Sequence, residues 1–202
     1  MNIKGLTDQI AQPLYDTFNL IAATPVFNLF QTQVGQGTGS FGANAATTAK
    51  TYADTNMDLP GQLPSGFAFQ VRGFRVMFPW NVTIADSLTF MNGAFIEFTI
   101  GAKVFLRIPA RTIPSGNGPF ISTNAGATAT ANVAAATSGW PSLQNGFAIG
   151  GKPLYMAATE NFKVTWNYPG ATPTITAQTN YQVTNSIPLT FVLDGYLGRP
   201  VQ

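Results

Sequence analysis

The chain has 202 residues, enough for one domain with a buried core, and it lacks cysteine and histidine, which excludes disulfides, thiolate metal sites and Ser-His-Asp or Cys-His catalytic arrangements. Charged residues make up only 9% of the chain, against roughly 25% in ordinary globular domains, and the net charge is +2. Because charge depletion marks the cores of protein interfaces, this composition favours a subunit whose surface is mostly interface over a β-rich secreted protein.

The N-terminal segment, residues 6–21, has apolar residues at intervals of three and four, which is typical of a helix. Pro13 interrupts the pattern, so we expect the helix to be short or kinked. Such a helix either packs on its own domain or docks on a neighbouring subunit or a membrane surface, and the pattern leaves both interpretations open. Six apolar residues of this region are candidate contacts between subunits: Leu6, Ile10, Leu14, Phe18, Phe27 and Phe30.

A first strand is predicted at 26–34, followed at 35–52 by a loop rich in Gly, Ala and Thr that lies exposed or crosses a neighbour. Residues 1–50 are therefore interpreted as an N-terminal arm with an extended loop, and residues 51–202 as the main domain. Lys4 is the only basic residue among the first 49 of the sequence, so we expect no strong binding of nucleic acid by this arm.

The strongest β pattern contains a change of phase. Apolar residues alternate over 67–71 and then, with the opposite parity, over 74–78. A single extra residue changes the phase in this way, so Arg72-Gly73 predicts a β-bulge in a long, bent strand.

A short helix and a hairpin follow along the chain. Thr83-Ile-Ala-Asp86 has the spacing of a capping box, which predicts a short inserted helix. Apolar residues then alternate over 96–100 and 104–108, and the two residues between these runs, Gly101-Ala102, match a type II′ turn.

The second half of the chain predicts a long loop and several strands. Residues 121–146 are rich in Ala, Thr, Asn and Gly, and Trp140 within this loop is a candidate exposed aromatic. Further strands are predicted at 154–156, 162–168, 175–181 and 187–193. The chain is thus predicted to be an all-β protein of about eight antiparallel strands with a short N-terminal helix and one short inserted helix, a count that suits a sandwich or a jelly roll.

The acidic residues are too scattered to predict a catalytic or metal site. There are eight, and no spacing brings two together as a glycosidase requires, so we expect them at caps, turns and the surface. Gly37-Thr-Gly39-Ser-Phe-Gly42 matches a dinucleotide fingerprint, but no βαβ unit is predicted around it. We therefore predict no catalytic residue, no cofactor and no metal ligand.

Four segments, taken in their order along the chain, resemble a known family of proteins. They are Asp54-Thr-Asn-Met-Asp-Leu-Pro-Gly-Gln-Leu-Pro64, which leads into the bulged strand, the hairpin at 95–109, and the segments 160–166 and 191–202. Together, over roughly residues 50–202, they resemble the jelly-roll coat proteins of tailless icosahedral bacterial viruses.

This resemblance implies a fold and a role. The fold is an antiparallel, eight-stranded, single jelly roll, and the role is that of a non-enzymatic capsid subunit that self-assembles in the virion. The resemblance does not decide between a major capsid protein and a vertex (penton) protein. The implied partners are copies of the chain itself, with a second capsid protein and an internal membrane as further candidates. The alternative function is a carbohydrate- or receptor-binding sandwich, such as a spike or adhesin, for which Trp140 is the candidate contact.

Overall fold

The computed structural model describes residues 8–21, 24–41, 48–79, 92–113, 120–123, 134–137, 146–169 and 186–200. The strands in chain order are β1 (Asp8–Ile10), β2 (Leu14–Ile21), β3 (Val26–Leu29), β4 (Ala68–Met77), β5 (Phe95–Ile100), β6 (Lys103–Pro109), β7 (Phe120–Thr123), β8 (Ala134–Thr137), β9 (Phe147–Ala148), β10 (Leu154–Met156), β11 (Phe162–Asn167) and β12 (Ser186–Arg199). A 3₁₀ turn, η1 (Ala110–Thr112), follows β6. The described part of the chain is all-β, as predicted.

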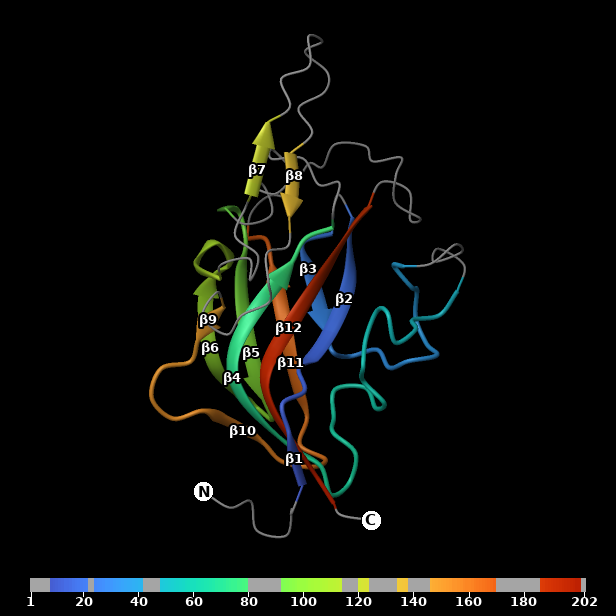
Figure 1. Ribbon diagram of the computed structural model, residues 1–202, viewed down its shortest axis with the longest axis vertical. Helices are drawn as coiled ribbons and strands as arrows, with labels where there is room; N and C mark the ends of the chain where they lie inside the picture. Colours follow the sequence, from blue (N-terminus) through green and yellow to red (C-terminus); the bar gives the residue numbers. More distant parts are fainter. Residues whose placement is uncertain are drawn as a thin grey trace.

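Two antiparallel sheets face each other as a β-sandwich (Figure 1). In the first sheet the order is β2-β12-β4-β10, with β1 pairing β12 on the side of β2 and β9 pairing β4 on the side of β10. In the second sheet the order is β3-β11-β5-β6. β7 and β8 pair separately.

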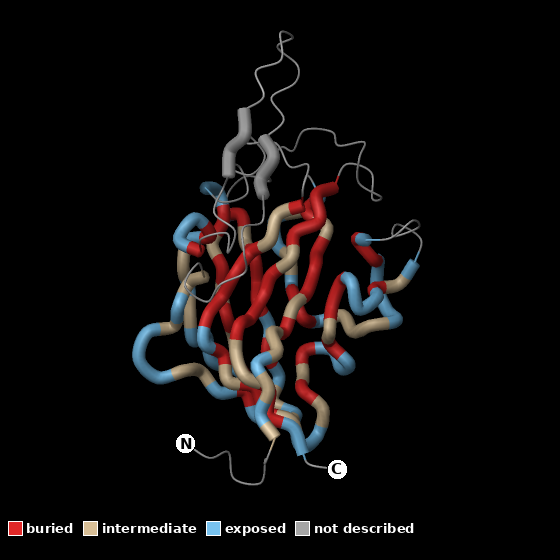
Figure 2. Tube along the Cα trace, in the orientation of Figure 1, coloured by how far each residue is buried: buried red, intermediate tan, exposed pale blue. Residues whose placement is uncertain are grey.

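The hydrophobic core lies between the two sheets, where most of the buried residues are found (Figure 2). Aromatic rings from opposite sheets meet there. The ring centroids of Phe74 and Phe98 are 5.5 Å apart, and those of Phe18 and Trp166 are 5.9 Å apart. Burying one side chain of the size of Phe contributes about 1.5–3 kcal/mol, so this layer supplies much of the driving force for folding.

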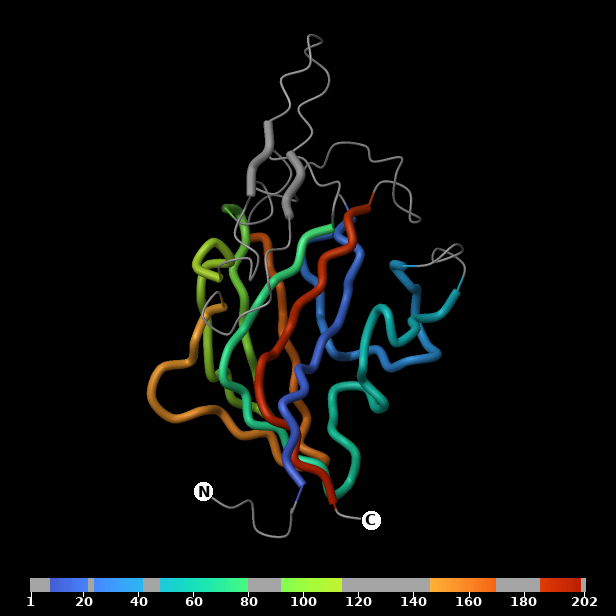
Figure 3. Tube along the Cα trace, in the orientation of Figure 1, coloured from blue at the N-terminus to red at the C-terminus, as the bar shows by residue number. Residues whose placement is uncertain are grey.

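The prediction of a helix within residues 6–21 is wrong, because Leu14–Ile21 forms the strand β2. This strand pairs with β12, with Leu14 opposite Leu193, so the two ends of the chain lie side by side (Figure 3). Leu14 and Phe18, four positions apart, share a face of a strand as well as a face of a helix, since four is a multiple of the strand period. Pairing with a buried strand outweighs the local preference.

The predicted β-bulge in β4 is confirmed. Gly73 lies opposite Asp194 and Val71 lies opposite Gly195, which leaves Arg72 as the extra residue. The apolar residues on both sides of the bulge therefore enter the same core despite their opposite parity.

The remaining elements follow the predictions in part. The hairpin of β5 and β6 is confirmed, with Gly101 at φ +58° in its turn. β12 continues beyond the predicted strand as far as Arg199. The predicted loop at 121–146 is wrong where β7 and β8 pair, because main-chain hydrogen bonds need no large side chains. The helix predicted from Thr83 and the strand predicted at 175–181 lie outside the described residues.

Candidate interaction surface

Most of the predicted contact residues belong to the core of the chain itself. Three of the six are buried: Leu14, Phe18 and Phe30. Two are partly buried against the same core: Ile10 and Phe27. The sixth, Leu6, and the candidate loop aromatic, Trp140, lie outside the described residues. Contact with a neighbouring subunit is therefore a wrong prediction for the three buried residues, since a side chain enclosed between two sheets does not reach a second molecule.

The loop between β3 and β4 pairs with the free edge of β2. The Thr17 N–H donates to the Asp54 carbonyl at 2.8 Å, and the Asn56 N–H donates to the Tyr15 carbonyl at 3.3 Å. The Asn56 side chain extends the pairing, because its Oδ1 accepts from the Tyr15 N–H at 2.9 Å and its Nδ2 donates to the Pro13 carbonyl at 2.8 Å. An open edge strand is a template for pairing with another sheet, and this loop occupies the edge of β2.

Replacing Asn56 tests how much this pairing contributes. We expect Asn56→Ala to lower the free energy of unfolding in urea by about 2 kcal/mol, because it leaves the Tyr15 N–H and the Pro13 carbonyl without their partner. Native-state hydrogen exchange at the Tyr15 amide should become faster. Gln36→Ala in the same loop is the control, because Gln36 is exposed. Equal effects of the two substitutions would contradict the role assigned to Asn56.

Two buried carboxylates hold this loop in place, since Asp16 of β2 binds it to the sandwich and Asp54 binds neighbouring parts of the loop to one another. Lys50 Nζ lies 2.6 Å from Asp16 Oδ1 and 2.7 Å from the Thr17 carbonyl oxygen. Asp54 accepts hydrogen bonds from three loop N–H groups: those of Ser40, Phe41 and Thr51. Burial raises the pKa of the Asp16 carboxyl above its usual value, while Lys50 and the Phe30 N–H act in the opposite direction. The predictions of an exposed Gly/Ala/Thr loop and a surface position are therefore wrong for Lys50 and Asp16.

The outer faces of the two sheets differ. On the first sheet, several residues that alternate with the core positions are also buried, among them Thr17, Arg75 and Val192. On the second sheet, one polar row crosses all four strands through Asn28, Thr165, Glu97 and Arg107. Glu97 and Arg107 form an ion pair across β5 and β6. Thr165 in this row is buried, but Asn28 and Arg107 are exposed and Glu97 is partly exposed, so the outer face of the second sheet is the more accessible one. The two charges within the row neutralise each other.

The described residues contain no cluster of acidic side chains able to hold a metal ion, and no helix among them is long and apolar enough to cross a membrane. A groove of about 760 Å³ lies between β1, the end of β12 and the loop before β4, and an exposed ion pair of Asp8 and Arg199 forms part of its wall. No protein-family model, curated protein or solved structure matches the chain.

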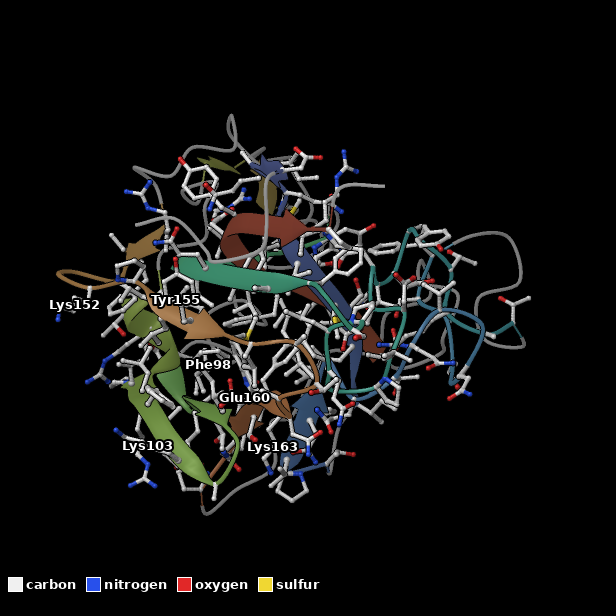
Figure 4. The ribbon with its side chains drawn as sticks, turned by 90° about the horizontal axis from the view of Figure 1, so that it is seen from below. Phe98, Lys103, Lys152, Tyr155, Glu160 and Lys163 are labelled. Carbon is white, nitrogen blue, oxygen red and sulfur yellow. The ribbon has the colours of Figure 1, made fainter. Side chains whose placement is uncertain are left out.

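Exposed apolar side chains belong to elements on two opposite sides of the sandwich, namely β6 and β10 on one side and the loop that covers β2 on the other (Figures 1 and 4). On the side of β6 and β10 they are Val104, Phe105 and Tyr155. On the side of the loop that covers β2 they are Phe41, Tyr52 and Leu59. The other exposed large apolar residues of the described chain, Ile21 and Val26, flank the turn between β2 and β3.

We name the two sides by their residues. The edge flank consists of Lys103, Val104, Phe105, Lys152 and Tyr155. The loop flank consists of Phe41, Tyr52, Asp58 and Leu59. Sequence reasoning did not find either flank, since alternation along the hairpin predicted that Val104 faces the core. The extra residue Phe105 changes the phase of β6 and leaves Val104 exposed.

Proposed function

We propose that the chain is a single jelly-roll subunit of an icosahedral viral capsid and that it acts by self-assembly. The observation that carries this proposal is the winding of the chain. β1 and β2 share one register on β12, with Ile10 opposite Leu197 and Leu14 opposite Leu193, so they act as one strand interrupted at Pro13. Counting β9 and β10 as one strand as well, and leaving out the separately paired β7 and β8, gives eight strands, which alternate between the two sheets except at the β5–β6 hairpin.

The order of these eight strands supports the jelly roll. Numbered along the chain, they lie in the order 1-8-3-6 in the first sheet and 2-7-4-5 in the second. Two Greek keys folded over each other give this arrangement. The positions of the strand ends also agree with a jelly roll. One row across the second sheet consists of Val26, Asn167, Phe95 and Pro109, and β1 and Arg199 lie at the opposite end of the sandwich (Figure 1).

The surface supports a role in assembly. A shell subunit needs apolar contacts on its sides but must not pair its sheet edges indiscriminately. The flanks provide exposed apolar side chains, and the loop occupies the edge of β2. The edge of β6 carries two features that discourage strand addition, namely Lys103 and the irregularity at Phe105.

In this proposal the protein has no catalytic role. The chain has neither histidine nor cysteine, and three buried carboxylates are engaged in hydrogen bonds that hold the fold together: Asp16, Asp54 and Asp194. Its principal partners are copies of itself, and its place is in the virion.

Assembly of the purified protein tests the proposal. We expect protein produced without any other coat protein to form particles of uniform diameter by electron microscopy when salt, pH and protein concentration are varied. Nuclease-treated samples form the control, since we expect the particles not to require nucleic acid held by an N-terminal arm. A chain that stays monomeric in analytical ultracentrifugation under all these conditions would contradict the proposed function.

A further inference from the structure

The edge flank and the loop flank are complementary in charge. Lys103 and Lys152 form no ion pair within the described chain, and Figure 4 shows them on the same side as Tyr155. Asp58 is the only exposed charged residue in the described part of the loop between β3 and β4, because Lys50 and Asp54 are buried. One flank therefore combines apolar side chains with positive charge, and the other combines them with negative charge.

The two flanks also lie on opposite sides of the molecule. Figures 1 and 4 show β6 and β10 on one side of the sandwich and the loop that covers β2 on the other. Because the elements that carry the two flanks lie on opposite sides, one subunit can contact a neighbour through each flank at the same time.

We propose that copies of this chain associate head to tail, with the edge flank of one subunit against the loop flank of the next. This inference rests on the proposed function and names the surface through which assembly proceeds. The contact is heterologous, meaning that two different patches meet, and such contacts generate closed rings when the rotation between neighbours closes. Apolar side chains form its centre, and Lys103 and Lys152 lie opposite Asp58.

A symmetric contact between two edge flanks fits the surface less well. It would bring the lysines of both copies together, and like charges across an interface oppose association. It would also place β6 beside β6, where Lys103 and the irregularity at Phe105 hinder continuous strand pairing. The lysine Nζ already lies over the Phe105 ring, 4.9 Å from its centroid. The head-to-tail contact is therefore made by side chains and does not extend the sheet.

Charge reversal with compensation tests the pairing of the flanks. The variant Lys103→Glu/Lys152→Glu should weaken self-association at least about tenfold in sedimentation equilibrium, because like charges then face each other. Adding Asp58→Lys to this variant should restore association to within about threefold of the wild type. The control is Arg72→Glu/Lys163→Glu, which makes the same change of net charge at exposed positions outside both flanks. An effect of the control equal to that of the flank variant, or no restoration by Asp58→Lys, overturns the inference.

A mixing experiment separates head-to-tail from symmetric association. An edge variant, Lys103→Glu/Phe105→Glu, and a loop variant, Tyr52→Glu/Leu59→Glu, each retain one intact flank. Each should be monomeric alone, and an equimolar mixture should form one-to-one dimers and nothing larger in size-exclusion chromatography with light scattering. Monomers in the mixture overturn the inference. Circular dichroism and thermal unfolding confirm that each variant is folded.

The outcomes distinguish this inference from the proposed function. Uniform wild-type particles together with a monomeric mixture leave the capsid function standing and reject the head-to-tail contact. Wild-type protein that never associates rejects both.

Discussion

Gly195→Ala is expected to lower the free energy of unfolding by about 4 kcal/mol or more. A Cβ at this position would overlap the Gln70 carbonyl oxygen and lie 2.8 Å from Cζ of Phe69. The carbonyl belongs to the main chain of β4, and the ring is fully buried, so neither can withdraw without opening the pairing of β4 with β12. Urea unfolding at equilibrium measures the loss, and a large fraction of insoluble protein on expression would be in line with it.

Gly150→Ala is the matched control for this substitution. Nothing lies within 4 Å of a Cβ at Gly150, so its effect should remain within about 0.5 kcal/mol. If the Gly195→Ala variant were as stable as the Gly150→Ala variant, this result would contradict the close approach of β4 and β12 at the bulge.

The bulge illustrates which features of the fold could be predicted from the sequence and which could not. The change of parity placed it at Arg72-Gly73, because one extra residue exchanges the two faces of a strand. The requirement for glycine at 195 could not be predicted in this way. It arises from a partner strand more than a hundred residues away, and nothing local to Gly195 indicates that Gln70 lies against it.

The prediction of a helix in the N-terminal region failed for a different physical reason. A spacing of four residues satisfies both a helix and a strand, so the period alone does not decide. The deciding term is the pairing of β2 with β12, a contact between the two ends of the chain. Contacts of this kind are invisible to a local pattern.

The candidate surface was the least predictable part. The richness of residues 35–52 in Gly, Ala and Thr predicted an exposed loop, whereas Lys50 from this loop is buried against Asp16, 34 residues earlier in the chain. Such a pair is specified by the fold, since the cost of burying each charge is met only where the other is within reach. The flanks depend in turn on this loop and on the phase of β6, which is why neither could be located before the register was known.

The second large effect on stability is expected from breaking the ion pair of Arg75 and Asp194. Arg75 Nε lies 2.5 Å from Asp194 Oδ2, and Nη2 lies 2.7 Å from Oδ1, so the guanidinium and carboxylate meet as a two-bond fork. Both side chains are 9% exposed, so the predicted surface position of this aspartate is wrong. We expect Arg75→Ala and Asp194→Ala each to lower the free energy of unfolding by about 3–5 kcal/mol, because each leaves the other charge buried without its partner.

The double substitution Arg75→Met/Asp194→Leu separates the value of the pair from the cost of a lone charge. Removing both charges removes both desolvation costs, so we expect the double variant to lie within about 1 kcal/mol of the wild type although each single alanine variant is strongly destabilised. Arg107→Ala, which breaks the more exposed pair with Glu97, should cost at most about 1 kcal/mol. All four variants are compared by urea unfolding at one pH and salt concentration. A double variant whose loss equals the sum of the two single losses would show that Arg75 and Asp194 contribute independently, and that the fork does not act as a unit.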